Sequence, residues 1–308
     1  MSSFGLAIAW EWEFDDDFIC GIERECRSRD ISTYQITPHN LPDVLLRIQR
    51  GELSFQAFYD RASDVDETFL ALVRLLDQPS VRVINPHDRV RHAIDKATMH
   101  LEFITNGLQV PYTIILSPYR KNGGVEIPTV DFQQLGKPFV VKPANTTGGG
   151  TGVVLNARTL EAVIEARKLH PDDKYLLQQF IHPKDLDGKR AWFRVYYAFG
   201  ETILCWWDDT THEYTPLSDG DELRYGLPPL RTVMITIQRI TQLDFFSSEI
   251  ALTDEGTLVV VDYVNEICDM RLKSRFRNGA PDAVVHRIEF LIAREVESHV
   301  AKLHREKA

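Results

Sequence analysis

The spacing of apolar residues divides the chain into a first part of alternating strands and helices and a later part rich in hairpins. Apolar runs bounded by polar or turn-forming residues predict strands, and apolar residues three and four apart predict helices. Strands are expected at 4–10, 32–36, 54–59 and 81–84, with helices at about 15–29, 41–50 and 66–77 between them. This β-α-β alternation favours a small parallel α/β sheet over residues 1–90.

Beyond residue 90 the helical pattern is at first continuous and then gives way to antiparallel strand pairs. One helix is expected to end at Gly107, with its faces marked by Val90, Ala93, Ile94, Ala97, Leu101 and Ile104. Strands follow at 112–116, 139–141 and 175–180, with a helix at 160–169. Two hairpins, 191–199 with 202–207 and 245–252 with 257–264, and a helix at 281–302 complete the chain. The first hairpin is expected to turn at Gly200-Glu201, a glycine-first pair suited to type II′. The fold class is therefore α/β followed by α+β.

Charge and composition exclude several kinds of partner. The formal net charge of −10 repels nucleic acids and acidic membranes. The chain has no apolar run long enough for a membrane span, and its first residues do not resemble a signal peptide, so a cytoplasmic protein is expected. Four cysteines without CxxC spacing (Cys20, Cys26, Cys205 and Cys268) are expected to be reduced and structural.

The stretch KPFVVKPANTTGGGTG, residues 137–152, combines a short strand, a lysine at its end and a glycine-rich turn. Gly148, Gly149 and Gly150 permit positive φ and close approach of the backbone to a ligand. Successive N–H groups in such a turn form an anion site, to which Thr147 and its neighbours add hydroxyl groups. This indicates a phosphate-binding loop, and the alternative is a mobile hairpin loop without a ligand.

A pair of acids on the last hairpin is a candidate metal site. If the hairpin loop has an even number of residues, Glu249 and Asp262 lie on the same face as neighbours. Two like charges there favour a cation, and Mg²⁺ prefers oxygen ligands and bridges phosphates. Asn265 offers a neutral amide oxygen nearby, and Glu266 is a further candidate. The alternative is two solvated acids on an exposed strand face.

In this order the motifs resemble those of the ATP-grasp superfamily, which includes D-alanine–D-alanine ligase, glutathione synthetase and ribosomal-protein glutamate ligases. The resemblance covers nearly the whole chain. It implies a pre-ATP-grasp α/β domain at 1–90 and an ATP-grasp domain at 91–308. In the latter, 91–179 is a small lobe with a glycine-rich lid, and 180–308 is a large lobe with the metal site.

The resemblance also assigns nucleotide-binding roles. Lys96 and Lys142 match the two lysines that reach ATP phosphates, although both could be surface lysines. In YLLQQFI, Gln178 takes the place of the adenine-contacting side chain, where the family often has glutamate. The remaining implied cofactor contacts are Thr147, Gly148, Gly149 and Gly150 in the lid, backbone groups of Gln179, Phe180 and Ile181, and Asp185 for the ribose. The sequence around Asp185, Asp-Leu-Asp-Gly, is also a common turn.

Catalytic and metal roles follow in the same way. Arg194 resembles the strand arginine that faces the phosphates, with a stacked structural arginine as the alternative, and Lys142 joins it as a catalytic candidate. A glycine-first turn puts Arg194 on the same face as Trp207. Glu249, Asp262 and Asn265 match the metal ligands. The family commonly has glutamate, any residue, asparagine, whereas Asp262 and Asn265 are separated by one residue more, which puts Asn265 in doubt.

The activity implied is an ATP- and Mg²⁺- (or Mn²⁺-) dependent ligase that joins a small carboxylate to an amine or thiol through an acyl phosphate. Arg271 and Ser274 are substrate candidates, and Arg224 and Arg231 are further phosphate candidates. The alternatives are a small-molecule kinase and a non-catalytic ATP-binding module. A homodimer is compatible with the family, and the segment 10–14, Trp-Glu-Trp-Glu-Phe, receives no role.

Overall fold

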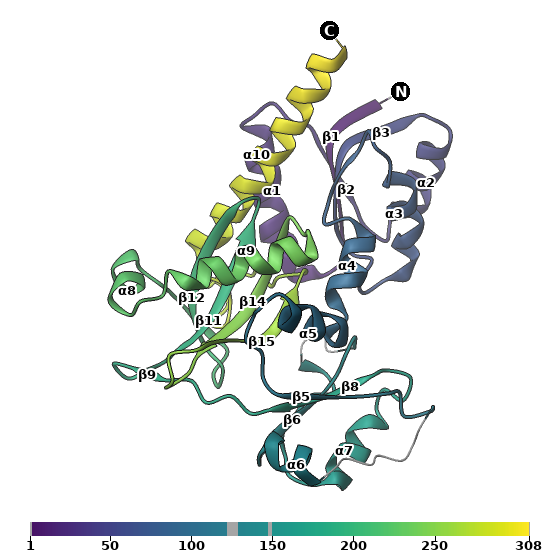
Figure 1. Cartoon of the computed structure of the whole chain (residues 1–308). Helices are drawn as coiled ribbons and strands as arrows, with labels where there is room; N and C mark the ends of the chain where they lie inside the picture. Colours follow the sequence, from purple (N-terminus) through teal and green to yellow (C-terminus); the bar gives the residue numbers. More distant parts are fainter. Residues whose placement is uncertain (1, 122–128, 147–149, 308) are drawn as a thin grey trace.

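The computed structural model describes residues 2–121, 129–146 and 150–307. Its N-terminal domain contains a four-stranded parallel sheet with the order β2-β1-β3-β4. Its strands are β1 (Ser2–Trp10), β2 (Thr33–Ile36), β3 (Leu53–Arg61) and β4 (Arg82–Ile84). Its helices are α1 (Asp16–Arg27), α2 (Leu41–Gln49) and α3 (Leu70–Leu76), with 3₁₀ turns at Glu13–Asp15 and Glu67–Phe69. The predicted parallel α/β domain is confirmed (Figure 1).

Both faces of this sheet are buried, because successive residues of β1 belong to different cores. Leu6 and Ile8 pack in the core that contains residues of α1 and of the last helix, α10 (Asp282–Lys307). Ala7 and Ala9 pack in a second core with residues of α2 and α3. A strand covered on both faces has a continuous apolar sequence, as residues 4–10 do.

The helix expected to run to Gly107 is divided into α4 (His87–Ile94) and α5 (Lys96–Thr105). Asp95, between them, has extended backbone angles, and its carboxylate accepts hydrogen bonds from the N–H groups of Ala97 and Thr98. A capping aspartate competes with the continuous helix and starts a new one. The break also changes the buried face, so Leu101 and Ile104 are exposed, contrary to the prediction.

The small lobe is an antiparallel sheet with the order β5-β8-β6-β7. Its elements are β5 (Thr113–Leu116), α6 (Thr129–Leu135), β6 (Phe139–Pro143), β7 (Val154–Ala157), α7 (Leu160–Arg167) and β8 (Tyr175–Gln179). Tyr175 and Leu177 pack in a core that includes residues of α6 and α7. Leu176, between them, packs in the core of the large lobe. The sheet therefore presents alternate residues of β8 to the large lobe. The pattern of apolar residues does not predict α6 or β7.

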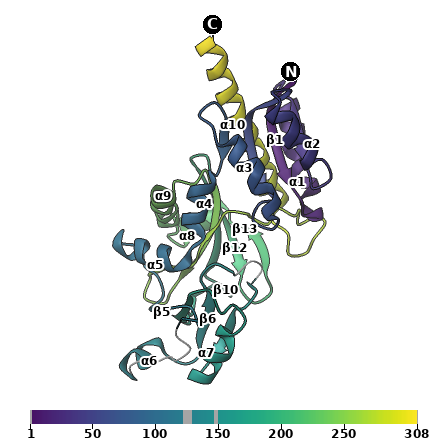
Figure 2. The same cartoon turned by 90° about the vertical axis from the view of Figure 1, so that its right-hand side faces the viewer.

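The large lobe is a five-stranded antiparallel sheet with the order β13-β12-β11-β14-β15. Its elements are β11 (Trp192–Ala198), β12 (Glu201–Asp208), β13 (Glu213–Pro216), α8 (Asp219–Arg224), α9 (Pro229–Thr241), β14 (Phe245–Leu252) and β15 (Leu258–Asn265). A short hairpin of β9 (Asp185–Leu186) and β10 (Lys189–Arg190) precedes it. The five-stranded sheet of the large lobe lies between the N-terminal domain and the small lobe (Figure 1, Figure 2).

The turn between β11 and β12 differs from the prediction. Ala198 pairs with Glu201, so the two central residues are Phe199 and Gly200, with φ of 47° and 93°. Positive φ at both positions is the requirement of a type I′ turn, not of type II′. The register is therefore shifted by two residues, which preserves the predicted faces because strand alternation has a period of two.

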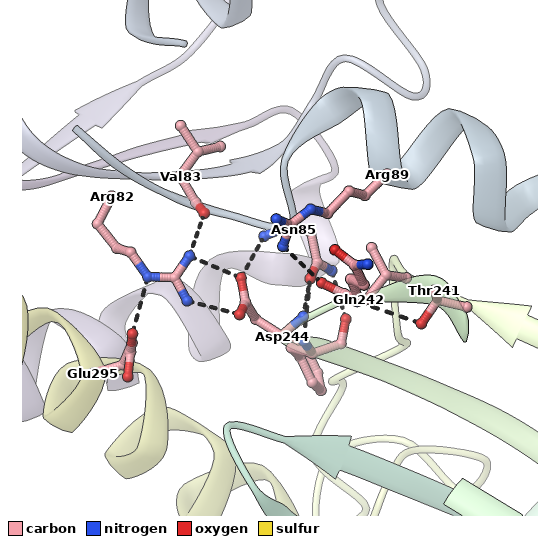
Figure 3. A network of polar contacts seen from close by, with 10 residues as sticks. Arg82, Val83, Asn85, Arg89, Thr241, Gln242, Asp244 and Glu295 are labelled. Atoms are coloured by element: carbon pink, nitrogen blue, oxygen red, sulfur yellow. Dashed lines mark hydrogen bonds and ion pairs between the residues drawn. The ribbon is translucent and has the colours of Figure 1, made fainter. Parts of the chain in front are cut away.

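The N-terminal domain is joined to the large lobe by a polar network at the end of β4 (Figure 3). Arg82 donates to both carboxylate oxygens of Asp244, at 2.7 and 3.0 Å, and to Glu295 of α10 at 2.9 Å. The side-chain oxygen of Asn85 accepts from the N–H groups of Asp244 and Phe245. Paired, half-buried charges at this point fix the position of one domain on the other.

Among the described residues no helix is both long and apolar enough to cross a bilayer.

Candidate active site

Two lysines, one from α5 and one from β6, meet strand β15. Lys142, at the end of β6, donates a hydrogen bond from Nζ to the carbonyl of Val261 at 3.1 Å. Lys96, the first residue of α5, has its Nζ 3.9 Å from Oδ1 of Asp262. Their exposed fractions are 6% and 9%. The two predicted phosphate-binding lysines therefore lie together, although they are 46 residues apart in the sequence.

The surroundings lower the proton affinity of one of these lysines. Burial lowers the pKa of Lys142 to about 8, and the nearby positive charge of Lys96 acts in the same direction against Asp262 and Glu249. Lys142 therefore keeps a lowered pKa even with two carboxylates nearby. A phosphate group placed beside it would relieve the repulsion between the two ammonium groups.

Glu249 and Asp262 are paired directly across β14 and β15, but not for the predicted reason. The loop between the paired ends Leu252 and Leu258 has five residues, 253–257, so regular pairing would place Glu249 opposite Val261. A register shift between Ile250 and Glu249 restores the match with Asp262. The expectation of a hairpin loop with an even number of residues was wrong. Glu249 and Asp262 are neighbours because of a β-bulge.

A second register shift on the same strand pair places Asn265. Between the Glu249–Asp262 and Ser247–Asn265 pairs, β15 has one residue more than β14. The additional residue between Asp262 and Asn265 is therefore accommodated by this register shift. In the amide orientation that satisfies both of its groups, Asn265 accepts from Nη1 of Arg194 at 3.2 Å and donates to the carbonyl of Ile267 at 3.1 Å.

The two carboxylates have different electrostatic surroundings. Burial and the charge of Asp262 raise the pKa of Glu249, although Arg194 opposes this. Burial also acts to raise the pKa of Asp262, but Lys96, Lys142 and Arg194 outweigh it and lower that pKa. Asp262 is therefore the more firmly ionised member of the pair.

Arg194 lies on β11, the central strand of the large-lobe sheet, on the same face as Glu249. Its Nη2 donates to Oε1 of Glu249 at 2.5 Å, and its guanidinium lies 5.1 Å from the ring centre of Trp207. The prediction that Arg194 and Trp207 share a face is confirmed. Trp192, two residues earlier on β11, donates from Nε1 to Oε2 of Glu249 at 3.1 Å. Sequence reasoning missed Trp192, although strand alternation alone puts it on the face of Arg194.

The residues expected to contact adenine, 178–181, lie in different surroundings. Gln178 is 2% exposed on β8, and its Nε2 donates to the hydroxyls of Tyr263, at 2.7 Å, and Thr113, at 3.1 Å. The N–H of Gln179 donates to the carbonyl of Tyr112. Phe180 and Ile181 continue past the strand, where Ile181 packs against the core shared by the large lobe and the N-terminal domain.

The glycine-rich loop is described only in part. Thr147, Gly148 and Gly149 lie outside the described residues, while Gly150 has φ of 78° and open space where a Cβ would be. The entry to the loop is held by Asp173, which accepts from the backbone and side chain of both Asn145 and Thr146. The function of the loop as a lid stays a prediction.

Several other predicted residues have protein partners away from the lysine–carboxylate group. Asp185 is exposed and accepts from the N–H of Gly188 in the β9–β10 turn, as expected of the turn alternative. The remaining contacts are these: Arg224 pairs with Asp187, Arg231 pairs through two bonds with Glu222, and the N–H of Ser274 donates to Asp282. Their predicted ligand roles stay predictions.

The unassigned segment 10–14 contacts Arg271. The Arg271 guanidinium lies 5.4 Å from the ring centre of Trp12 and 5.2 Å from that of Phe276, and it is paired with Asp269. Phe14 completes the aromatic group, with its ring 5.5 Å from Phe276. The charge of Arg271 is already paired with Asp269. Arg271 therefore forms a contact between the N-terminal domain and the loop that follows β15.

Glu266 lies beside the site and also faces the N-terminal domain. Burial raises its pKa to about 7, with Asp64 adding to the increase and Lys96 opposing it. Asp64 follows β3, so this interaction crosses between domains. Neither Asp64 nor its position beside Glu266 was expected from the sequence, because the contact depends on how two domains pack.

Comparison with known proteins identifies the fold. No family model and no curated protein sequence matches the chain. Among solved structures, the chain is similar to a RimK domain ATP-grasp protein from Sphaerobacter thermophilus, with a TM-score of 0.61 and 19% identity over 93% of this chain and 99% of that one. It is also similar to D-alanine–D-alanine ligase from Bacillus anthracis complexed with ATP, with a TM-score of 0.64 and 14% identity over 96% and 98%. The macrocyclase MdnC from Microcystis aeruginosa, bound with its precursor peptide, has a TM-score of 0.64 and 12% identity over 93% and 99%.

Proposed function

We propose that this chain, which has the ATP-grasp fold, is an ATP-dependent ligase that activates a carboxylate as an acyl phosphate and transfers the acyl group to an amine or thiol. The observation that carries the proposal is the meeting of Lys96, Lys142, Arg194, Glu249 and Asp262. These five side chains come from α5, β6, β11, β14 and β15, and Glu249 and Asp262 are direct cross-strand neighbours. The similarity to several ATP-grasp ligases supports the same reaction class.

The site suits a divalent metal bound between phosphates and protein oxygens. Glu249 and Asp262 lie opposite one another, and Asn265 is brought to the same ladder, so the donors available are all oxygen. Such a hard, partly anionic set fits Mg²⁺, or Mn²⁺, better than a softer metal. When bound, the ion would supply charge neutralisation for the terminal phosphates of ATP.

The protein's own cations then have separable roles. Lys96 and Lys142 neutralise phosphate oxygens, since both ammonium groups are directed toward β15. Nε of Arg194 is buried and has no hydrogen-bond partner among the described residues. Arg194 therefore retains a donor for charge that develops during phosphoryl transfer.

In the proposed reaction, a substrate carboxylate oxygen attacks the γ-phosphorus of ATP, and the bond to the β-phosphate oxygen breaks to release ADP. The nitrogen of the amine then attacks the acyl carbon, and phosphate leaves with the electron pair of the carbon–oxygen bond. The amine gives up its proton to solvent or a nearby base. Positioning and electrostatics are sufficient for the first step, because phosphoryl transfer needs little covalent help.

Isotope transfer tests the mechanism most directly. The protein is incubated with ATP, Mg²⁺ and pools of ¹⁸O-carboxylate acids with amines or thiols, and hydroxylamine is added in parallel as a trap. An acyl phosphate predicts one ¹⁸O in the released phosphate and a hydroxamate in the trapped reaction. A stable phosphorylated product would instead identify a kinase. ATP binding without turnover of any pool would favour the non-catalytic module.

A matched pair of variants tests the metal assignment. Asp262→Asn removes one carboxylate of the site and is expected to abolish turnover with the fold intact by circular dichroism. Asp254→Asn makes the same change in the exposed turn of the same hairpin and is expected to retain full turnover. If Asp262→Asn also kept full activity, Asp262 would not hold the metal.

A further inference from the structure

A chain of three buried polar groups joins the small lobe to the large lobe behind the lysine pair. Nδ1 of His100, on α5, lies 2.6 Å from the hydroxyl of Tyr263, on β15. The same hydroxyl accepts from Nε2 of Gln178, on β8, at 2.7 Å. His100 and Gln178 are 4% and 2% exposed, and Tyr263 is fully buried. Neither His100 nor Tyr263 was singled out by the sequence.

The direction of the hydrogen bonds in this chain follows from Thr113. Its hydroxyl donates to the carbonyl of Pro111 at 2.8 Å and therefore accepts from Gln178, which identifies the nitrogen end of the amide. The amide nitrogen of Gln178 can only donate, so the Tyr263 oxygen accepts from it and has its own hydrogen to give to His100. Nδ1 of His100 must then be an acceptor, which requires a neutral ring. Burial, together with the charge of Lys142, lowers the pKa of His100 to about 4, so the ring is neutral near pH 7.

With Nε2 of Gln178 occupied, the acceptor atom of the same amide, Oε1, is left available. Its Nε2 is occupied by two hydroxyl oxygens, those of Tyr263 and Thr113, whereas Oε1 accepts no hydrogen bond from the part of the chain that the structure describes. Val140 and Lys142 are the neighbours of Gln178 and Leu176 across β6 and β8, so Gln178 is on the same sheet face as Lys142. The amide thus offers an acceptor, and not a donor, beside the proposed nucleotide site.

We propose that His100 and Tyr263 are positioning residues that hold the Gln178 amide with its oxygen available to a 6-amino purine and thereby select adenine over 6-oxo purine nucleotides. The proposal rests on the proposed function, because it needs a nucleotide beside Gln178. Adenine presents an N6 donor, whereas guanine and hypoxanthine present an oxygen acceptor. An oxygen facing Oε1 leaves two buried acceptors without a hydrogen.

A glutamine has no intrinsic preference between these bases, because rotation of its amide exchanges donor and acceptor. Selectivity therefore comes from the two hydroxyls that accept from Nε2. The Tyr263 hydroxyl, at 2.7 Å, gives its hydrogen to His100, and the Thr113 hydroxyl, at 3.1 Å, gives its hydrogen to the carbonyl of Pro111. Loss of the Tyr263 hydroxyl, or of the His100 acceptor, removes the shorter of these two bonds and so lowers the cost of rotating the amide toward a 6-oxo base.

The test compares the dissociation constants of ATP and inosine triphosphate, measured by calorimetry with Mg²⁺ on the intact protein. The two nucleotides differ at the 6-position, where the base has an amine or an oxygen. For the unaltered chain, ATP is expected to bind about ten- to a hundred-fold more tightly, the usual cost of a buried unmatched polar pair. In Tyr263→Phe this ratio is expected to fall about ten-fold, mainly through tighter binding of inosine triphosphate.

Three further variants separate positioning from general loosening of the lobe. Tyr175→Phe removes another buried hydroxyl of β8, which bonds Ala166 and His170 but not Gln178, and is expected to leave the ratio unchanged. His100→Asn keeps an acceptor near the place of Nδ1 and is expected to retain selectivity, whereas His100→Leu is expected to lose it. If Tyr263→Phe does not fold, the comparison of His100→Asn with His100→Leu tests the proposal in its place.

A double variant supplies an independent readout. Gln178→Glu replaces the amide by a carboxylate, which presents an acceptor in either orientation, so adding Tyr263→Phe to it is expected to leave the ratio unchanged. The proposal is overturned if the unaltered chain binds both nucleotides equally, or if Tyr263→Phe and Tyr175→Phe change the ratio alike. Absence of binding to either nucleotide would overturn the proposed function as well, whereas the preceding outcomes leave it standing.

Discussion

The ion pair between Arg61 and Asp15 offers a sharp test of how the N-terminal domain is attached. Nε and Nη2 of Arg61 donate to the two carboxylate oxygens of Asp15 at 2.8 and 2.7 Å. The exposed fractions of these side chains are 0% and 1%. Nη2 also donates to the carbonyl of Cys268 at 3.1 Å, just beyond β15. The pair therefore links the end of β3 to the loop that follows the proposed metal strand.

Asp15→Ala leaves the Arg61 charge buried, with Cys268 and Tyr59 as its remaining polar partners. Removing one member of a buried pair typically lowers the free energy of unfolding by about 3–5 kcal/mol, because the other charge is left without compensation. Replacing both members by apolar residues of similar size, as in Asp15→Leu with Arg61→Met, is expected to recover most of this loss.

The assay is urea unfolding followed by tryptophan fluorescence and circular dichroism. The control is Asp172→Ala, which removes a surface pair with Arg120 at 2.9 Å whose two side chains are both 68% exposed. Exposed pairs of this kind contribute about 0–1 kcal/mol. Equal destabilisation by Asp15→Ala and Asp172→Ala, or no recovery in the double variant, would refute the reasoning.

Three further predictions concern other parts of the molecule. Because the pKa of Lys142 in the free protein is about 8, its charge is present below that pH and is lost above it. The dissociation constant for ATP should therefore be constant below about pH 7 and rise above pH 8, and Lys142→Arg should flatten that profile in calorimetry. Neutral His100 contributes stability that is complete above pH 6.5 and is lost as the pH falls toward its folded pKa of about 4. His100→Leu should therefore reduce the loss of unfolding free energy over that range by up to about 3 kcal/mol. Gly279→Ala would place a Cβ 2.5 Å from the carbonyl of Arg271, so a destabilisation of about 1–3 kcal/mol is expected in urea. The control is Gly220→Ala, whose Cβ would meet only Oγ of Ser218, at an ordinary contact distance of 3.7 Å.

Several elements could be predicted because their signal is local. The strands of the N-terminal sheet, the strand that ends at Lys142 and the paired strands β14 and β15 are bounded by turn residues and carry apolar runs. Helix α9 was not assigned, because its β-branched residues Val233, Ile235 and Thr236 weaken helix propensity. Its helical form comes from packing of Met234 and Ile237 in the core of the large lobe.

The sequence alone determined which chemical groups the site contains: two lysines, an arginine and two acids, on strands and a helix whose order resembles the ATP-grasp superfamily. It could not determine how these groups meet. The Glu249–Asp262 pair depends on a bulge, the place of Asn265 on a second shift, and the orientation of Gln178 on His100 and Tyr263 from other elements. Residue type and strand period are properties of the local chain. Register shifts and contacts between lobes arise from packing among segments far apart in sequence, and therefore only the tertiary structure decided them.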